Sequence, residues 1–263
     1  MIHEISASDF LKLISTTKNI QEVILPPKGK FPKLVEGICF EQVDFNHPIL
    51  GGFLSKPVIR KCTFIESIFD GINAEKSLFE DCIFNNVVFG KRFVGRIDNS
   101  KFINCSFNKC QFSDTMFEND FFEKCNFNDC KFTKSNFNNC NLQKVTFSGS
   151  FKSVNWVKCV SDKVDVSNVD MKDVSLIDSE SYDIKFPNNK NNFVVYRKDF
   201  ECAETELKEK LSAKTFEEFC YMAKFISEHF IYGTIIDEDF VRNSSKAEKK
   251  IIMEVLFSCS NTK

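Results

Sequence analysis

Residues 100–149 decide the fold, and they read SKFINCSFNKCQFSDTMFENDFFEKCNFNDCKFTKSNFNNCNLQKVTFSG. From Phe102 to Phe147 a large apolar side chain recurs at every fifth residue, and only Leu142 departs from Phe. A period of five fits neither an α-helix nor a straight β-strand. Successive members would rotate by about 140° around a helix, and they would alternate between the two faces of a straight strand. They share one buried side only if the chain turns a corner within every five residues.

The residue two places before each of these side chains is mostly small. In this stretch it is Ser100, Cys105, Cys110, Thr115, Asp120, Cys125, Cys130, Ser135, Cys140 and Val145. A spacing of two places it on the same side of an extended segment as the large residue. The other positions are rich in Asn, Asp, Lys, Ser and Gln, which suit turns and solvent.

Cysteine spacing indicates how many corners make one coil. Cys62 and Cys82, Cys105 and Cys125, and Cys110 and Cys130 are each 20 residues apart. Four corners give a square coil of 20 residues, in which each pair stacks on neighbouring turns about 4.8 Å apart. Asp120 falls at an inward position, where a lone carboxylate is costly. We therefore expect the strand to be distorted there or Asp120 to turn outward.

Pentads such as Cys105-Ser106-Phe107-Asn108-Lys109 and Cys125-Asn126-Phe127-Asn128-Asp129 resemble those of the pentapeptide-repeat protein family. The resemblance covers roughly residues 38–186. It implies a right-handed, four-sided parallel β-helix, a pentapeptide-repeat solenoid. The sequence departs from the common family pattern in having Cys, Ser or Val rather than Ala at the small position.

The five-residue register continues on both sides of the central stretch, with slips. An earlier run holds Phe64, Phe69, Ala74, Phe79, Phe84 and Phe89, and a later one holds Trp156, Ser161, Val166, Met171, Leu176, Ser181 and Phe186. The frame shifts across residues 90–96 and near residues 148–150. In a solenoid such insertions map to loops, which often carry binding surfaces. A frame shift can also be a bulge that only restores the register of the chain.

Both ends of a β-helix expose ladder edges that must be covered. Residues 7–16 have the pattern of an amphipathic helix and residues 23–25 that of a strand. Helical spacing returns over residues 200–211, 216–230 and 247–257, and the pairs Thr215/Glu218 and Ser245/Glu248 fit capping boxes. We expect a mainly β protein with an N-terminal cap (helix plus strand) at 1–37, the β-helix at 38–190 and a C-terminal α-helical module at 191–263.

Composition excludes several classes of protein. The chain has 263 residues, a net charge of -2 and 43% hydrophobic residues, which argues against a disordered chain and against general nucleic-acid binding. No apolar run is long enough for a membrane span, and no secretion signal is evident. Eight of the 12 Cys occupy inward small positions, where a free thiol acts as a small hydrophobe. Reduced cysteines and the missing signal favour a cytoplasmic location.

Chemistry-bearing motifs are missing from the sequence. The three His residues have no helix-spaced partner of a metal motif, and cysteines five apart lie on different sides of the coil, whereas zinc needs converging ligands. There is no Gly-rich phosphate loop and no nucleophile elbow. We expect no enzymatic activity, no cofactor and no metal.

Two groups of residues are candidates for partner binding. Lys91, Arg92 and Arg96 bring three positive charges together at the first frame shift. The C-terminal helices carry large apolar residues that exceed what a cap needs to bury, and these are Phe216, Phe219, Tyr221, Phe225 and Phe230. The C-terminal helices can equally be a large cap that binds nothing.

The sequence therefore favours a non-enzymatic protein-binding or scaffold protein. Its rigid rod would present polar side chains, and its C-terminal helices would serve as a cap, a dimerisation module or a partner-binding module. The partner would be a protein or a second copy of the chain, without direct binding of nucleic acid or membrane. The resemblance implies one alternative, a DNA-mimic modulator of type II topoisomerases, but residues 40–186 contain 18 Lys+Arg and 20 Asp+Glu. Such a rod is nearly neutral, whereas mimicry of DNA needs a strongly negative surface. An effector or immunity-type protein is a further alternative.

Overall fold

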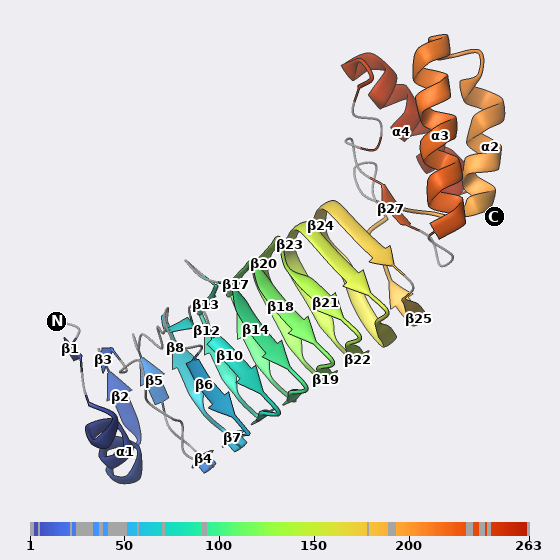
Figure 1. The fold of residues 1–263 in the computed structure, drawn as a ribbon. Helices are drawn as coiled ribbons and strands as arrows, with labels where there is room; N and C mark the ends of the chain where they lie inside the picture. Colours follow the sequence, from blue (N-terminus) through green and yellow to red (C-terminus); the bar gives the residue numbers. More distant parts are fainter. Residues whose placement is uncertain are drawn as a thin grey trace.

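The structure of the chain is a computed structural model. It describes residues 3–4, 6–21, 23–24, 34–36, 39–41, 52–56, 58–69, 72–90, 94–177, 179–188, 193–229, 234–236, 240 and 243–261. Short strands follow one another around four sides of a coil, and each pairs in parallel with the strand on the same side of the next coil. The result is the parallel β-solenoid in the middle of Figure 1. This confirms the four-sided coil predicted from the pentads.

The strands of the solenoid are grouped here by side. Side one holds β4 (Leu34–Glu36), β7 (Val58–Arg60), β11 (Leu78–Glu80), β15 (Lys101–Ile103), β19 (Phe121–Glu123) and β22 (Asn141–Gln143). Side two holds β2 (Asn19–Gln21), β5 (Cys39–Glu41), β8 (Thr63–Ile65), β12 (Ile83–Asn85) and β16 (Ser106–Asn108). Side three holds β9 (Ile68–Phe69), β13 (Val88–Phe89) and β17 (Gln111–Ser113). Side four holds β6 (Gly52–Ser55), β10 (Ile72–Glu75), β14 (Gly95–Asp98), β18 (Thr115–Glu118) and β21 (Asn136–Asn138). Four longer strands continue around corners, and these are β20 (Asn126–Thr133), β23 (Thr146–Val157), β24 (Val160–Ile177) and β25 (Glu180–Lys185).

The large residues of the pentads fill the solenoid as stacked columns of rings. On side two, Phe64, Phe84, Phe107, Phe127 and Phe147 form one column, with successive ring centroids 4.8, 4.6, 4.5 and 4.7 Å apart. Rings on neighbouring sides meet edge to face, as Phe107 and Phe112 do at 5.9 Å. Stacked and edge-to-face contacts are both common between aromatic rings. The distance between stacked rings matches the spacing between paired strands, because each ring sits on the strand of the next coil.

The small inward residues sit at the corners and donate hydrogen bonds to the previous coil. The Cys125 thiol donates to the Phe102 carbonyl at 3.4 Å, and the Ser135 hydroxyl donates to the Phe112 carbonyl at 3.1 Å. Alanine has no donor for this carbonyl, which gives a physical reason for Cys and Ser here. Eight thiols are free and buried as the sequence predicted, and they are Cys62, Cys82, Cys105, Cys110, Cys125, Cys130, Cys140 and Cys159.

Asp120 corrects one expectation, because its side chain points inward and is only 1% exposed. The two carboxyl oxygens accept hydrogen bonds from the backbone N–H groups of Ser100 at 2.6 Å and Glu118 at 3.1 Å. These two donors hold the group in the corner without a break in the strand register on either side. Burial raises the pKa of this carboxyl from 3.8 to about 8, although the two N–H donors act in the opposite direction.

Both frame shifts seen in the sequence occur at a corner that contains glycine. Phe79 pairs with Ile59, 20 residues earlier, and with Phe102, 23 residues later, so the coil is three residues longer around Gly90. The second shift removes one residue at Gly149, where the register between β20 and β23 is irregular. Gly90 and Gly149 have φ of 69° and 111°. A Cβ at Gly149 would clash with the Cys130 carbonyl, so the shortened corner requires glycine.

The N-terminal end of the rod carries one helix. α1 (Ala7–Thr16) begins at the predicted residue, where the Ser6 hydroxyl accepts from the Asp9 N–H at 3.1 Å. β1 (His3–Glu4) pairs in parallel with β3 (Val23–Ile24). β2 pairs with β5 and therefore already belongs to the ladder of side two.

The C-terminal helices pack around a core of their own beyond the last coil (Figure 1). The elements are β26 (Phe193–Val195), α2 (Arg197–Leu207), α3 (Ala213–His229), β27 (Thr234–Ile236) and α4 (Lys246–Asn261). β26 and β27 form an antiparallel pair that the sequence did not predict. Contacts between β24 and β27 join this module to the solenoid.

The two predicted capping boxes have different outcomes. At the start of α4 the Ser245 backbone N–H donates to the Glu248 carboxylate at 3.3 Å, and the Glu248 N–H donates to the Ser245 hydroxyl at 3.3 Å. This box is confirmed. The prediction for Thr215 with Glu218 was wrong, because α3 begins at Ala213 and the Ser212 hydroxyl accepts the Thr215 N–H at 3.4 Å.

Candidate functional site

The first candidate was the positive segment at the frame shift. Lys91 and Arg92 lie outside the described residues. Arg96 lies on the outer surface of side four, half-exposed, and its guanidinium pairs with Glu118 at 2.7 Å and with Asp98 at 3.5 Å. Within the described residues, its charge is therefore compensated by neighbouring acids rather than free for an anionic partner.

Those acids form a short outward column on side four. Glu75, Asp98 and Glu118 occupy equivalent positions in three successive coils, as the strand registers of β10, β14 and β18 require. Lys76 pairs with Glu75 at 2.8 Å and lowers the pKa of that carboxyl. Arg96 and Lys76 thus neutralise much of the column, and surface pairs of this kind contribute little to stability.

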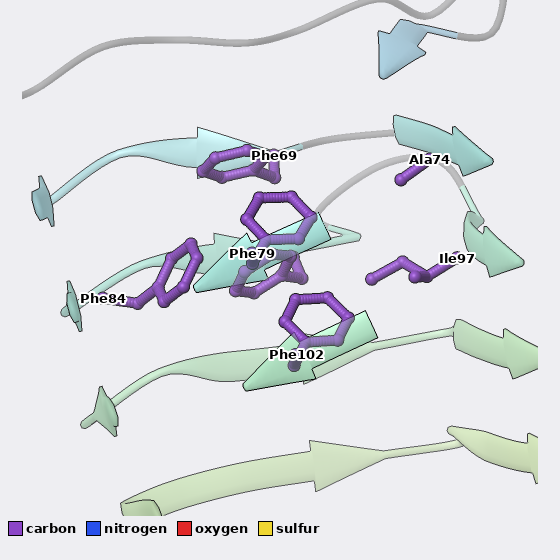
Figure 2. Close-up of a pocket in the computed structure, with 7 residues that line it drawn as sticks. Phe69, Ala74, Phe79, Phe84, Ile97 and Phe102 are labelled. Carbon is purple, nitrogen blue, oxygen red and sulfur yellow. The ribbon is translucent and has the colours of Figure 1, made fainter. Parts of the chain in front are cut away.

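A small apolar cavity lies inside the rod at the coils that precede the central stretch. Ala74 and Ile97 stand on side four where Phe117 and Phe137 stand in later coils, and the space is completed by Phe69, Phe79, Phe84, Phe89 and Phe102 (Figure 2). Its volume is about 10 Å³. A space of that size without polar lining is too small and too apolar for a water or a ligand, so it is a packing gap and not a binding site.

The second candidate was the set of large apolar residues in the helical module. Phe219 is fully buried, and its ring meets those of Phe200 and Phe240. Phe216 is half-buried against the same core. Tyr221 is 71% exposed and Phe225 is 44% exposed. Phe230 lies outside the described residues. α3 therefore uses one face for the module core and turns two aromatic side chains toward solvent.

The exposed residues of α3 follow one stripe along the helix. The stripe is defined here by Lys214, Glu217, Tyr221, Lys224, Phe225 and Glu228, all of which are exposed. Their spacing of three or four residues keeps them on one face of a helix. Lys224 lies 4.0 Å from Glu228. The stripe thus holds two aromatic residues between a cation at one end and an anion at the other.

Glu248 holds the starts of α3 and α4 together. One carboxylate oxygen accepts from the Ser212 hydroxyl at 2.7 Å and the other from the Ser245 hydroxyl at 2.7 Å. These hydrogen bonds, with the Ser212 backbone N–H, lower the pKa of Glu248 to about 2. They link the residue that precedes α3 to the first turn of α4.

One disulfide contradicts the expectation of reduced cysteines. Cys202 on α2 and Cys259 on α4 are bonded to each other, with Cα atoms 6.1 Å apart. Neither lies in a pentad, so sequence spacing gave no signal for the pair. Within the described part of the chain, Cys202, Glu206 and Cys259 are also the one group of three such side chains close enough to share a metal ion. The disulfide already uses both sulfurs, and Glu206 pairs with Lys210 at 3.1 Å.

Comparison with known proteins agrees with the geometry of the rod. Residues 100–186 match the family model described as a pentapeptide repeat region. The chain carries a pentapeptide-repeat region. In the structure the same register begins before this region, since Phe64, Phe84 and Phe107 stack in one column. No curated protein sequence matches the chain.

Several solved structures resemble the solenoid at low identity. A trypsin-treated form of QnrB1, a plasmid-mediated fluoroquinolone resistance protein, is 13% identical with a TM-score of 0.35, and the match covers 66% of this chain and 87% of that one. HetL, a pentapeptide repeat protein involved in heterocyst differentiation regulation from the cyanobacterium Nostoc sp. strain PCC 7120, is 13% identical with a TM-score of 0.30, covering 70% and 98%. Rfr23, from the cyanobacterium Cyanothece 51142, is 10% identical with a TM-score of 0.17, covering 66% and 97%.

The pentapeptide-repeat region and the helical module also differ in what they leave exposed. In residues 100–147 the outward positions are mostly polar, whereas α3 exposes Tyr221 and Phe225.

None of the helices in the described ranges combines the length and the apolar character needed to cross a membrane.

Proposed function

We propose that the protein is a non-enzymatic binding scaffold, in which the pentapeptide-repeat rod carries a helical module that docks to another protein through α3. The observation that carries this proposal is the 71% exposure of Tyr221 on a helix whose opposite face is filled by Phe219. Tyrosine is enriched at protein interfaces because its large ring and its hydroxyl can both be used there.

The charges beside Tyr221 favour a second copy of this chain as the partner. If two α3 helices pack antiparallel with Tyr221 on the two-fold axis, a residue a given number of positions before Tyr221 faces one the same number after it. Lys214 then faces Glu228 of the second copy, because each lies seven residues from Tyr221. Glu217 similarly faces Phe225 and lies next to Lys224. Opposite charges thus meet at both ends of the stripe, as a self-complementary interface requires.

The expected dimer is weak. One face of a 17-residue helix buries less than the roughly 800 Å² per partner of a standard interface. We therefore expect a dissociation constant in the micromolar range or weaker, and complementary charges that fix the antiparallel register more than they add affinity.

Sedimentation velocity of the full chain across protein concentrations tests the proposal. Lys214→Glu places two carboxylates opposite each other at both ends of the interface, so it should abolish the dimer. The double variant Lys214→Glu with Glu228→Lys restores opposite charges and should recover the dimer. Lys198→Glu, on an exposed position of α2, is the matched control and should behave as the unchanged chain.

The result that overturns the proposal is equal behaviour of all four proteins. A chain that stays monomeric throughout refutes the second copy as partner. A dimer that survives Lys214→Glu refutes the α3 stripe as its interface.

The DNA-mimic alternative has one feature in its favour, the acidic column of Glu75, Asp98 and Glu118. Arg96 pairs with two members of that column, and mimicry of a phosphate backbone depends on uncompensated negative charge. We therefore rank it second. Tight binding of a purified type II topoisomerase to the full chain, lost when the three acids are replaced by Gln or Asn, would reverse this order.

A further inference from the structure

The disulfide between Cys202 and Cys259 ties the last turn of α4 to α2. Cys202 is exposed on α2, whereas Cys259 is 4% exposed and packs in the core of the helical module. The two residues are 57 positions apart. The Cys202 end of the bond therefore lies at the surface of the helical module, while the Cys259 end is held by the packing of α4.

The free thiols of the described residues are poorly placed for thiol–disulfide exchange. Eight of them lie at inward corners of the solenoid and are buried, and thiols such as Cys110 and Cys130 donate to backbone carbonyls of the previous coil at 3.4 and 3.3 Å. Cys220 on α3 is half-buried, and burial together with Glu204 raises the pKa of its thiol. Thiol–disulfide exchange needs an accessible sulfur and a thiolate. Among the described cysteines, we therefore expect this exchange at the bond between Cys202 and Cys259.

The last turn of α4 contacts both the rest of the helical module and the end of the solenoid. The Phe257 ring lies 5.2 Å from that of Phe193 on β26. The Asn188 amide, three residues beyond β25, donates to the Asn261 side-chain oxygen at 3.2 Å. The disulfide therefore fixes a turn that contacts the β26–β27 pair and the end of the solenoid.

We propose that the Cys202–Cys259 disulfide is a redox-controlled latch that fixes the end of α4 against α2 and the last coil. A dithiol reductant opens it in two steps. Its thiolate attacks the exposed Cys202 sulfur, the S–S bond breaks, and the Cys259 sulfur leaves and takes a proton. The second thiol of the reductant then displaces Cys202 as a thiol, and the reductant ends as a disulfide. The latch is closed in an oxidising compartment and open in a reducing one.

Hydrogen–deuterium exchange with mass spectrometry tests the latch in the full chain, with dithiothreitol as the reductant. Alkylation before exchange counts the reduced thiols and verifies that the bond has opened. We expect peptides covering residues 251–261 to exchange at least tenfold faster after reduction. Peptides covering residues 101–147 should not change. Cys202→Ser should show the fast exchange with or without reductant, and Cys220→Ser should respond as the unchanged chain does.

Two results overturn the proposal. One is unchanged exchange of residues 251–261 after the bond has been shown to open, which would make the disulfide irrelevant to the position of α4. The other is the absence of a bond between Cys202 and Cys259 in chain purified without reductant and oxidised in air. Both readouts are independent of self-association through α3.

Discussion

Replacing Asp120 by Ser should stabilise the solenoid at neutral pH, although it removes one of the two hydrogen bonds that Asp120 accepts. Ser is the natural occupant of the same corner column at Ser77 and Ser100, and the Ser100 hydroxyl accepts the Ser77 N–H at 3.0 Å. A hydroxyl at position 120 can accept the Ser100 N–H in the same way. The replacement therefore loses one backbone hydrogen bond and removes the buried carboxyl.

The size of the effect follows from the raised pKa of Asp120. A carboxyl that binds its proton more tightly in the folded state loses stability as pH rises, because the unfolded chain ionises first. With a pKa that rises from 3.8 to about 8, and about 1.4 kcal/mol for each pH unit, the cost is at most about 4 kcal/mol at pH 7. The lost hydrogen bond offsets about 1 kcal/mol of this. Asp120→Ser should therefore gain about 3 kcal/mol at pH 7 and almost nothing near pH 4.5.

Urea unfolding between pH 4.5 and 8.5 measures this difference. Trp156 is the single Trp of the chain and is 2% exposed in the same rod, so its fluorescence reports unfolding of the solenoid. Asp120→Asn is a neutral variant of the same shape and should show the same pH trend, whereas the exposed Asp114→Asn should not. Parallel pH profiles for Asp120→Ser and the unchanged chain would refute the reasoning, since they would mean that the two N–H donors keep Asp120 ionised when folded.

Three further predictions test the pentads, the corners and the helical module. Phe127→Ala should cost about 3–5 kcal/mol, as truncation of a buried ring does, and the exposed Asn128→Ala less than about 0.5 kcal/mol; equal costs in urea unfolding would refute the register. Lys144 holds a φ of 55°, which favours Asn, so Lys144→Asn should raise the unfolding free energy by about 0.5–1 kcal/mol, and a loss of stability would show that the corner is not strained. Glu248 has its pKa lowered to about 2, so its hydrogen bonds stabilise the helices above pH 4.5 and are lost as pH falls toward 2. Helix content measured by circular dichroism should decline over that window in the unchanged chain and change less in Glu248→Gln, and an identical acid transition in both proteins would contradict the assignment.

The rod was predictable from the sequence because each pentad repeats one physical requirement. A large residue must lie inward in every strand and a small one at every corner, so Phe107, Phe127 and their neighbours specify the register without any long-range information. The two frame shifts were visible for the same reason, as changes in the spacing of Phe89, Phe102, Phe147 and Trp156. Their cause was not visible, because the close approach of Gly149 to Cys130 exists only after the coils have stacked.

Features that depend on distant residues were not predictable. Asp120 was expected to distort the strand or to turn outward, because a lone buried carboxylate is costly. Its two donors are backbone N–H groups, which every sequence has, so no sequence pattern marks them. The disulfide joins α2 to α4 across 57 residues that carry no repeat. The candidate site shows the same limit: Phe219 and Tyr221 are both aromatic residues on α3, and only the packing against Phe200 shows that one is buried and the other exposed.

Disulfide trapping at Tyr221 tests the central claim of the scaffold most directly, because the proposed two-fold axis passes through that residue. In full-length chain carrying Cys220→Ser, Tyr221→Cys should form a covalent dimer within minutes of mild oxidation, seen by non-reducing electrophoresis. In the same background, the two copies of Lys214→Cys would lie about 20 Å apart along the helix pair, at 1.5 Å per residue. This variant should therefore form no covalent dimer. Efficient trapping at Tyr221 alone is the predicted result, and no trapping at Tyr221, or equal trapping at both positions, would contradict the account.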